Sequence, residues 1–147
     1  MVINEMSEQE CFAHLERASI GRLGCCYEDQ PYVVQVTLAY QAKCLYVLST
    51  YGQKIAWMRK NPNVCVAVDD IQSESRWTSV IANGTYQELE PVQFADEREH
   101  AKKLLEKRHR WWQTPMAERQ AKVGDKLIEP IFFRIQITSV SGLKAEG

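Results

Sequence analysis

Three β-type runs lie close together between residues 20 and 49, and the short turns between them limit the possible folds more than any other feature. The runs are 20–27, 32–40 and 44–49, and they are separated by the turns 28–31 and 41–43. The run 32–40 is rich in β-branched and aromatic residues on alternating faces. Parallel neighbours need a crossover of about a dozen residues or more, and these turns are far shorter. The sequence therefore predicts an antiparallel meander.

Three further strands are predicted after the meander. Residues 64–68 (VCVAV) form an unbroken apolar run, which indicates a strand buried on both faces. Residues 77–89 have the pattern of a long strand in which Gly84 is typical of a bulge or a bend. In 131–140, apolar residues alternate along one face. The chain therefore has six predicted strands.

Helix signals flank these strands. Ser7 and Glu10 have the spacing of a capping box at the start of a short helix. A brief helix ends before Pro62, because proline disfavours the helical conformation at the preceding residue. The clearest helix is 91–110, with acidic residues early and basic residues late, as the helix dipole favours. A further helical stretch is predicted at 116–122. Six strands and few helices favour a mainly β (α+β) single domain, 1–147, closed or nearly closed as a barrel.

Composition argues against several classes of partner. The net charge is −1 with 25% charged residues, so no strong field would attract nucleic acid or an anionic membrane. No apolar run approaches the roughly 18 residues of a membrane span, and the first residues are acidic, unlike a signal peptide. Five cysteines without CxxC spacing favour reduced thiols, and adjacent Cys25 and Cys26 point to opposite strand faces. We expect a cytoplasmic protein.

The segment STYGQK (49–54) has the composition of a phosphate site. The hydroxyls of Ser49 and Thr50 can donate to phosphate oxygens, Gly52 permits close backbone approach, and Lys54 supplies a positive charge. The helix that follows offers free N–H groups to an anion. The alternative is a capped helix start, with Thr50 as the cap and Lys54 in solvent.

Other kinds of site lack their signatures. The segment is not a Walker A loop, which would need glycine in place of Val47 and a hydroxyl in place of Ile55. There is no dinucleotide-binding GxGxxG motif and no GxSxG nucleophile elbow. The three histidines lack metal-ligand spacing, so no metal site is predicted. Chemistry would have to come from a cofactor.

Several segments, in their order and spacing, resemble one known family. They are IGRLGC, QPYVVQVTLAY, LYVLSTYGQK followed by RKNPNVCVAVDD, WTSVIANGTYQEL, and IFFRIQITSVSGLKA. Together they resemble the pyridoxamine 5'-phosphate oxidase-like FMN-binding split-barrel families, especially the nitroimidazole-reductase-like branch, over nearly the whole chain. The resemblance implies a six-stranded antiparallel split β-barrel with a few peripheral helices. It also implies FMN as the cofactor and a homodimer with two FMN sites at the subunit interface.

The resemblance also implies where the cofactor binds. The end of the third strand and the turn after it would bind the FMN phosphate, and the second strand would run along the isoalloxazine ring. A strand residue after Trp77 would approach the cofactor. The corresponding residues are Ser49, Thr50 and Lys54; Val34, Gln35, Val36 and Thr37; and Ser79 or Val80. Vitamin B6 oxidases proper carry further arginines in the phosphate loop and a C-terminal arginine motif, which argues against B6 oxidation here.

Two other features have both a structural and a functional interpretation. Trp111 and Trp112 could cover a flavin face from the partner subunit, or pack in the core or the dimer interface. Arg22 lies in an otherwise apolar strand, and either pairs with Asp69 or Asp70 or contacts the cofactor.

The resemblance predicts a flavin oxidoreductase that passes electrons from NADH or NADPH to a small molecule. No catalytic acid or base is assigned. The alternatives are a non-catalytic flavin-binding or sensing module and a haem-binding split barrel, and no histidine is assigned as a haem ligand.

Overall fold

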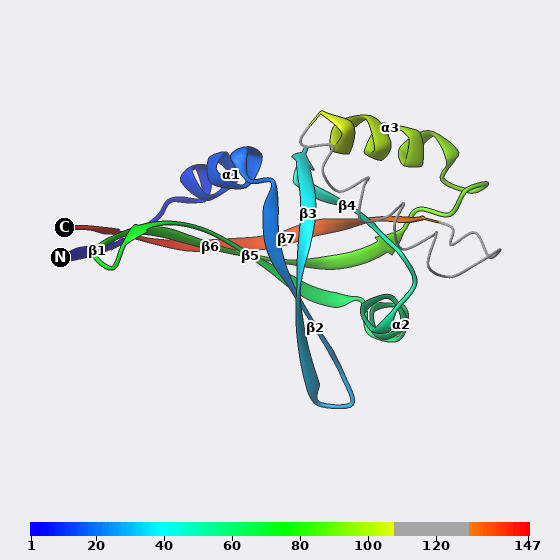
Figure 1. The fold of residues 1–147 in the computed structure, drawn as a ribbon, viewed down its shortest axis with the longest axis horizontal. Helices are drawn as coiled ribbons and strands as arrows, with labels where there is room; N and C mark the ends of the chain where they lie inside the picture. Colours follow the sequence, from blue (N-terminus) through cyan, green and yellow to red (C-terminus); the bar gives the residue numbers. More distant parts are fainter. Residues whose placement is uncertain (108–129) are drawn as a thin grey trace.

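The computed structural model describes residues 1–107 and 130–147. This part of the chain has seven strands and three helices, which are labelled in Figure 1. In chain order they are β1 (Val2–Glu5), α1 (Glu8–Arg17), β2 (Ile20–Tyr27), β3 (Gln30–Gln41), β4 (Cys44–Ser49), α2 (Gln53–Lys60), β5 (Asn63–Ser73), β6 (Arg76–Glu88), α3 (Ala95–Glu106) and β7 (Ile131–Glu146).

The strands form one antiparallel sheet that closes on itself. Its order is β1-β7-β4-β3-β2-β5-β6, and β6 also pairs with β7, so that six strands form a ring. This confirms the mainly β class and the six-stranded split barrel. The predicted meander is β2, β3 and β4. Its two turns are tighter than predicted, because the two residues of each, Glu28 with Asp29 and Ala42 with Lys43, adopt positive φ, as two-residue hairpin turns require.

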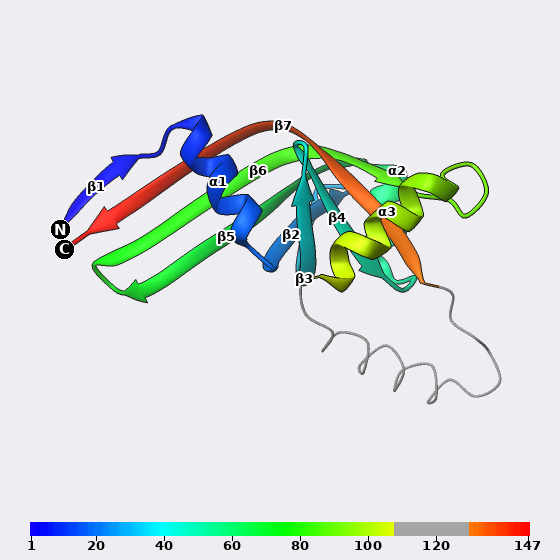
Figure 2. The same ribbon diagram turned by 90° about the horizontal axis from the view of Figure 1, so that it is seen from above.

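An arm extends from the barrel and carries both termini (Figures 1 and 2). It consists of β1 and the far ends of β5, β6 and β7. The sequence patterns missed β1 and the last residues of β5 and β7, because these residues are mostly exposed and show no apolar alternation. At the base of the arm, α1 begins with the predicted capping box of Ser7 and Glu10.

Inside the barrel, one apolar face of each strand forms the main core. On β5, Val64, Val66 and Val68 are buried but Cys65 and Ala67 are only half-buried, so the prediction of burial on both faces is right for one face only. A smaller core lies under α3 and includes Leu105. This helix begins at Ala95, after a turn, rather than at Pro91.

Gly84 marks a bulge, as predicted. The pairing of β6 with β7 shifts register between Asn83 and Gly84. A Cβ added at Gly84 would lie 2.5 Å from the carbonyl oxygen of Gln136. Only glycine fits this close approach of two backbones.

Candidate functional site

The barrel is split where β4 leaves β3. The last pair between these strands is Leu38 with Val47, whereas β3 continues beside β2 for its whole first half. Within the described residues, β3 from 30 to 37 is therefore paired on one side only. The Leu38 N–H donates to the Ser19 carbonyl at 3.0 Å, so the backbone groups of Leu38 face β2. Strand alternation then directs the backbone groups of Gln35 and Thr37 to the open edge.

The segment that follows β4 leads from this split to α2. Ser49 and Thr50 are both buried, at 6% exposure. The Ser49 hydroxyl donates to the Thr50 carbonyl at 3.0 Å. No residue among 1–107 and 130–147 is hydrogen-bonded to the Thr50 hydroxyl. A buried hydroxyl normally has a partner, so this group is a candidate for contact with a ligand.

The start of α2 is also open. Its N-cap is Gly52, and no side chain caps it, so Thr50 is not the helix cap and that interpretation of the segment is wrong. The first N–H groups of a helix have no acceptor within the helix. A Cβ at Gly52 would meet nothing within 4 Å, which leaves this backbone accessible. Its φ of −176° is extended, so the conformation itself does not require glycine.

Lys54 lies in the first turn of α2, which packs against β2. Burial raises the pKa of the Cys25 thiol on β2, and the Lys54 ammonium opposes that rise. Lys54 itself is half-buried. A phosphate between the start of α2 and the open edge of β3 would lie within its field.

The structure brings together some predicted site residues and separates others. Gln35 and Thr37 lie on the opposite face of β3 from Val34 and Val36, whose side chains belong to or pack on the core. A second set is remote from them. Val80 is fully buried in the core and Ser79 is half-buried on β6, the third strand from β3, or about 14 Å away at normal strand spacing. Trp111 and Trp112 lie outside the described residues.

A sheet face outside the barrel was not predicted as a site. We call it the outer face; it carries Gln35, Arg22, Ala67, Ile81 and Ser141, which lie side by side across β3, β2, β5, β6 and β7. Arg22 forms the predicted ion pair with Asp69, at 3.4 Å. A cavity of about 560 Å³ lies here, and its lining includes Gly24, Cys26, Val33, Cys65 and Asn83. Its small residues are scattered along four strands, so no local pattern indicates it.

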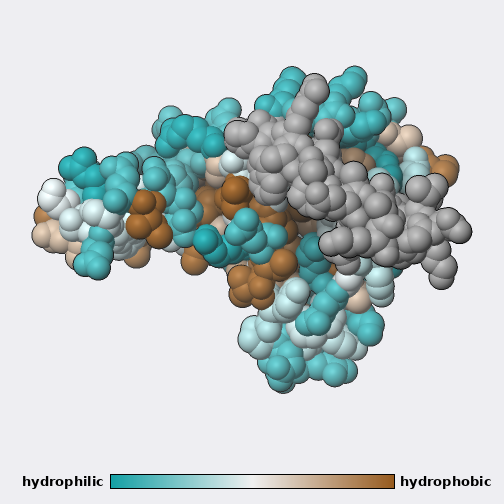
Figure 3. Space-filling model, in the orientation of Figure 1, coloured by the Kyte–Doolittle hydropathy of each residue, from teal (hydrophilic) through white to brown (hydrophobic). Residues whose placement is uncertain are grey.

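Apolar side chains are exposed on this same face. Ile20, Val33, Ile81 and Leu143 are each more than 40% exposed, and their register places them with the outer-face residues. Figure 3 shows apolar side chains gathered at the surface between the arm and the hairpin. Several apolar side chains exposed on one face are typical of an interaction site.

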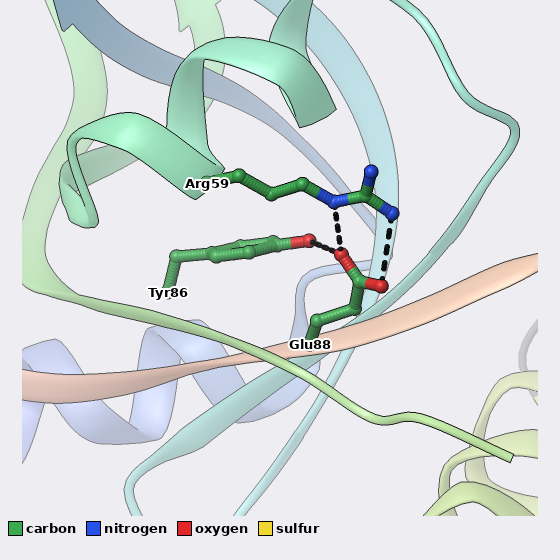
Figure 4. Close-up of polar contacts among 3 residues, drawn as sticks. All are labelled: Arg59, Tyr86 and Glu88. Atoms are coloured by element: carbon green, nitrogen blue, oxygen red, sulfur yellow. Dashed lines mark hydrogen bonds and ion pairs between the residues drawn. The ribbon is translucent and has the colours of Figure 1, made fainter.

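A polar cluster ties α2 to β6 (Figure 4). Arg59 donates through Nε and Nη2 to the two carboxylate oxygens of Glu88, at 2.8 and 3.0 Å, and the Tyr86 hydroxyl donates to Glu88 Oε1 at 2.7 Å. The guanidinium lowers the pKa of Glu88, while burial and the carboxylate raise the pKa of Tyr86. Sequence reasoning missed this cluster, because Arg59 is 29 positions from Glu88 and no local pattern pairs the two.

Comparison with known proteins identifies the family. Residues 7–144 match the model of the family described as pyridoxamine 5'-phosphate oxidase. The chain belongs to this family. An uncharacterized protein of Rhizobium meliloti (strain 1021) is 37% identical to it over 146 residues, which cover 99% of this chain and 97% of that protein.

Two solved structures have folds similar to that of this chain. An FAD-binding protein of Mesorhizobium loti matches this chain with a TM-score of 0.80 and 36% identity, over 99% of this chain and 100% of that one. A candidate 5-nitroimidazole antibiotic resistance protein of Bacteroides thetaiotaomicron shares the fold at a TM-score of 0.68 and 16% identity, over 100% of this chain and 93% of that one. The resemblance inferred from the sequence motifs is confirmed.

Two further observations concern this pyridoxamine 5'-phosphate oxidase family chain. None of the helices in the described ranges is long and apolar enough to cross a membrane. Across those same ranges, no three histidine, cysteine or acidic side chains gather where they could hold a metal ion.

Proposed function

We propose that this protein binds a flavin nucleotide, FMN, at the split between β3 and β4. The observation that carries the proposal is the buried Thr50 hydroxyl, which has no partner among the described residues and directly follows β4, the strand that leaves β3 at the split. Leaving such a group unpaired costs about 1–3 kcal/mol, and a phosphate oxygen would remove that cost. The FAD-binding relative at 36% identity supports a flavin over other phosphate ligands.

The residues present fit such a cofactor. Ser49, Thr50 and Lys54, with the first N–H groups of α2, hold the phosphate. The backbone groups of Gln35 and Thr37 at the open edge of β3 hydrogen-bond the polar edge of the ring, while Val34 and Val36 anchor the strand in the core. This arrangement would orient the ring along β3.

The proposed activity is that of an oxidoreductase. A bound flavin supplies electron transfer between a nicotinamide donor, NADH or NADPH, and a small-molecule acceptor. The side chains of the chain position the cofactor and tune the ring edge, and none is assigned as a catalytic acid or base. A cytoplasmic location and the sensing of flavin without catalysis stay predictions.

We also propose that the outer face forms a homodimer interface. Ser79 is too far from β3 to contact a flavin bound at the split of its own subunit, but it lies on the exposed face through which a second copy would pack. A two-fold dimer would bring it toward the partner's cofactor. The same packing would cover the exposed Ile81 and Val33 side chains.

The visible spectrum of the purified protein tests the proposal. We expect flavin absorption bands that bleach on anaerobic addition of NADH or NADPH. Bands that persist with both donors would support a flavin-binding module without this activity. A Soret band would show haem instead, and a protein that neither carries nor takes up a flavin would contradict the proposal.

A further inference from the structure

A second cavity opens beside the proposed phosphate site. It has a volume of about 290 Å³, and its lining includes Tyr51, Arg59, Arg98, Pro130 and Ile131. Tyr51 directly follows Thr50, and Ile131 pairs with Ser49 across β4 and β7. The cavity therefore lies beside the segment that holds Ser49 and Thr50. Its volume is at the lower end of the range of about 300–1,000 Å³ for small-molecule sites, so it suits a compact group.

Two guanidinium groups line this cavity. Glu88 binds Nε and Nη2 of Arg59, which leaves Nη1 on the far side of the guanidinium, pointing away from the carboxylate in Figure 4. Arg98 donates through Nη2 to the Pro130 carbonyl at 3.1 Å and lies over the Phe132 ring at 5.0 Å. Among the described residues of the lining, Glu88 is the one acidic side chain, so two positive charges face one negative charge there. The balance favours an anion.

An accessible aromatic ring completes the lining. Tyr51 is 58% exposed, and the Arg59 guanidinium carbon lies 5.5 Å from its ring centroid. An exposed tyrosine ring backed by a guanidinium is a stacking surface for a flat, electron-rich ring. Paired arginines and such a ring within one small cavity match a ligand that has both an anionic group and a flat heterocycle.

We propose that this cavity binds an adenylate, with the adenine on Tyr51 and the phosphate on Arg98 and Arg59. The inference rests on the proposed flavin site, because Tyr51, which lines the cavity, directly follows Thr50, where the flavin phosphate is proposed to bind. The adenylate half of FAD is the first source of this group. The adenylate of a nicotinamide dinucleotide donor is the second, and both have the same recognition chemistry.

Binding measurements on the cofactor-free protein test the inference. We expect FAD to bind about tenfold tighter than FMN, because one added charge-assisted contact contributes about this much to affinity. Arg98→Gln and Tyr51→Leu should each remove about tenfold of FAD affinity and leave FMN affinity unchanged. Tyr51→Phe, which keeps the ring, should retain FAD affinity. Arg76→Gln, an exposed arginine at the other end of β6, is the matched control and should change neither.

Competition by AMP distinguishes the two sources. If FAD fills the cavity, AMP binds the FMN-loaded protein but not the FAD-loaded protein. If the nicotinamide donor fills the cavity, FAD and FMN bind with equal affinity. NADH then displaces AMP from the FMN-loaded protein, and Arg98→Gln weakens the binding of both NADH and AMP. AMP that binds neither form, or variants that weaken FMN and FAD alike, would overturn the inference while leaving the flavin proposal intact. Binding of AMP without any flavin binding would overturn the proposed function and retain the cavity assignment.

Discussion

At the scale of single residues, a bound ligand would act on Thr50 and on Lys54 in different ways. The Thr50 hydroxyl is buried without a partner in the described part of the chain, so it lowers the stability of the cofactor-free protein. Lys54 is half-buried at the start of a helix, where a positive charge opposes the helix dipole. A bound phosphate would accept a hydrogen bond from the Thr50 hydroxyl and would offset the positive charge of Lys54. Substitutions of the two residues therefore test the site independently.

Replacing Thr50 by valine should separate fold from binding. Valine has the same shape and no hydroxyl, so the free energy of unfolding of the cofactor-free protein should stay the same or rise by about 1 kcal/mol. Flavin affinity should fall at the same time. Urea denaturation and flavin titration measure the two quantities. A cofactor-free variant that is clearly destabilised would show that the hydroxyl has a structural role instead.

Replacing Lys54 by alanine should weaken the binding of the phosphate specifically. A charge-assisted contact contributes roughly 1.5–3 kcal/mol, so FMN affinity should fall on the order of 10- to 100-fold. Riboflavin, which has no phosphate, should bind weakly and respond little to the substitution. Lys102→Ala, on the exposed face of α3, is the control. Equal losses for FMN and riboflavin, or no loss for either, would contradict a phosphate contact.

At the scale of elements, α2 is fixed to the barrel by contacts of its own side chains and not by an N-terminal cap. Arg59 near its end pairs with Glu88 on β6, and Ile55 and Met58 are buried in the core. The open start of the helix is thereby fixed in place without any side chain covering it. A rigid but uncapped helix start is suited to an anion.

The pH dependence of stability should report this attachment. Arg59 holds the pKa of Glu88 below its ordinary value of 4.5. The carboxylate therefore stabilises the fold above that value, and this contribution is lost as the pH falls through the lowered pKa. Glu88→Gln should cost about 1 kcal/mol at neutral pH and flatten the loss of stability in acid. Glu90→Gln, an exposed neighbour, should match the wild type in urea unfolding across pH; an unchanged acid profile in Glu88→Gln would refute the assignment.

Two glycines offer a matched comparison of packing. A Cβ at Gly84 would meet the backbone of β7 at 2.5 Å, so Gly84→Ala should cost about 3 kcal/mol in unfolding free energy. Gly52 has open space, so Gly52→Ala should cost at most about 1 kcal/mol, from a poorer N-cap. Denaturant unfolding of both variants measures the difference. Similar costs at the two positions would show that the bulge tolerates a side chain.

At the scale of the whole molecule, the barrel leaves one sheet face uncovered. The outer face combines small residues, a cavity and exposed apolar side chains on five strands, and the arm extends it beyond the barrel (Figure 2). A second copy of the chain would bury this surface. Binding to the folded dimer alone would also couple cofactor binding to assembly.

Assembly and cofactor binding should therefore respond together. We expect a dimer in sedimentation, and Ile81→Glu should shift it to monomer and weaken flavin binding, because a charge would be buried at the interface. Val92→Glu, at a 92% exposed site in the turn before α3, should do neither. Flavin at a hundredfold above its Kd should stabilise the wild type by about 2.7 kcal/mol. A wild-type monomer that binds FMN tightly would contradict the interface model.

The sequence alone determined the elements whose signals are local. The β2–β3–β4 meander, the Ser7–Glu10 capping box and the Gly84 bulge follow from alternation, turn length and residue type within a few positions, and the structure has all three. The motif order also identified the family. The candidate phosphate residues were chosen in the same way, because 49–54 is one continuous segment.

Tertiary structure decided the features that depend on distant pairing. β1 pairs with β7, which lies at the opposite end of the chain. In the arm, β5 and β7 continue with mostly exposed residues that show no apolar alternation, so the sequence pattern did not predict these extensions. The departure of β4 from β3 opens the edge of β3, although the sequences of both strands have a regular strand pattern. Arg59 and Glu88 meet across 29 positions of sequence. Such contacts are set by how strands close into a barrel, and a local pattern holds no information on closure.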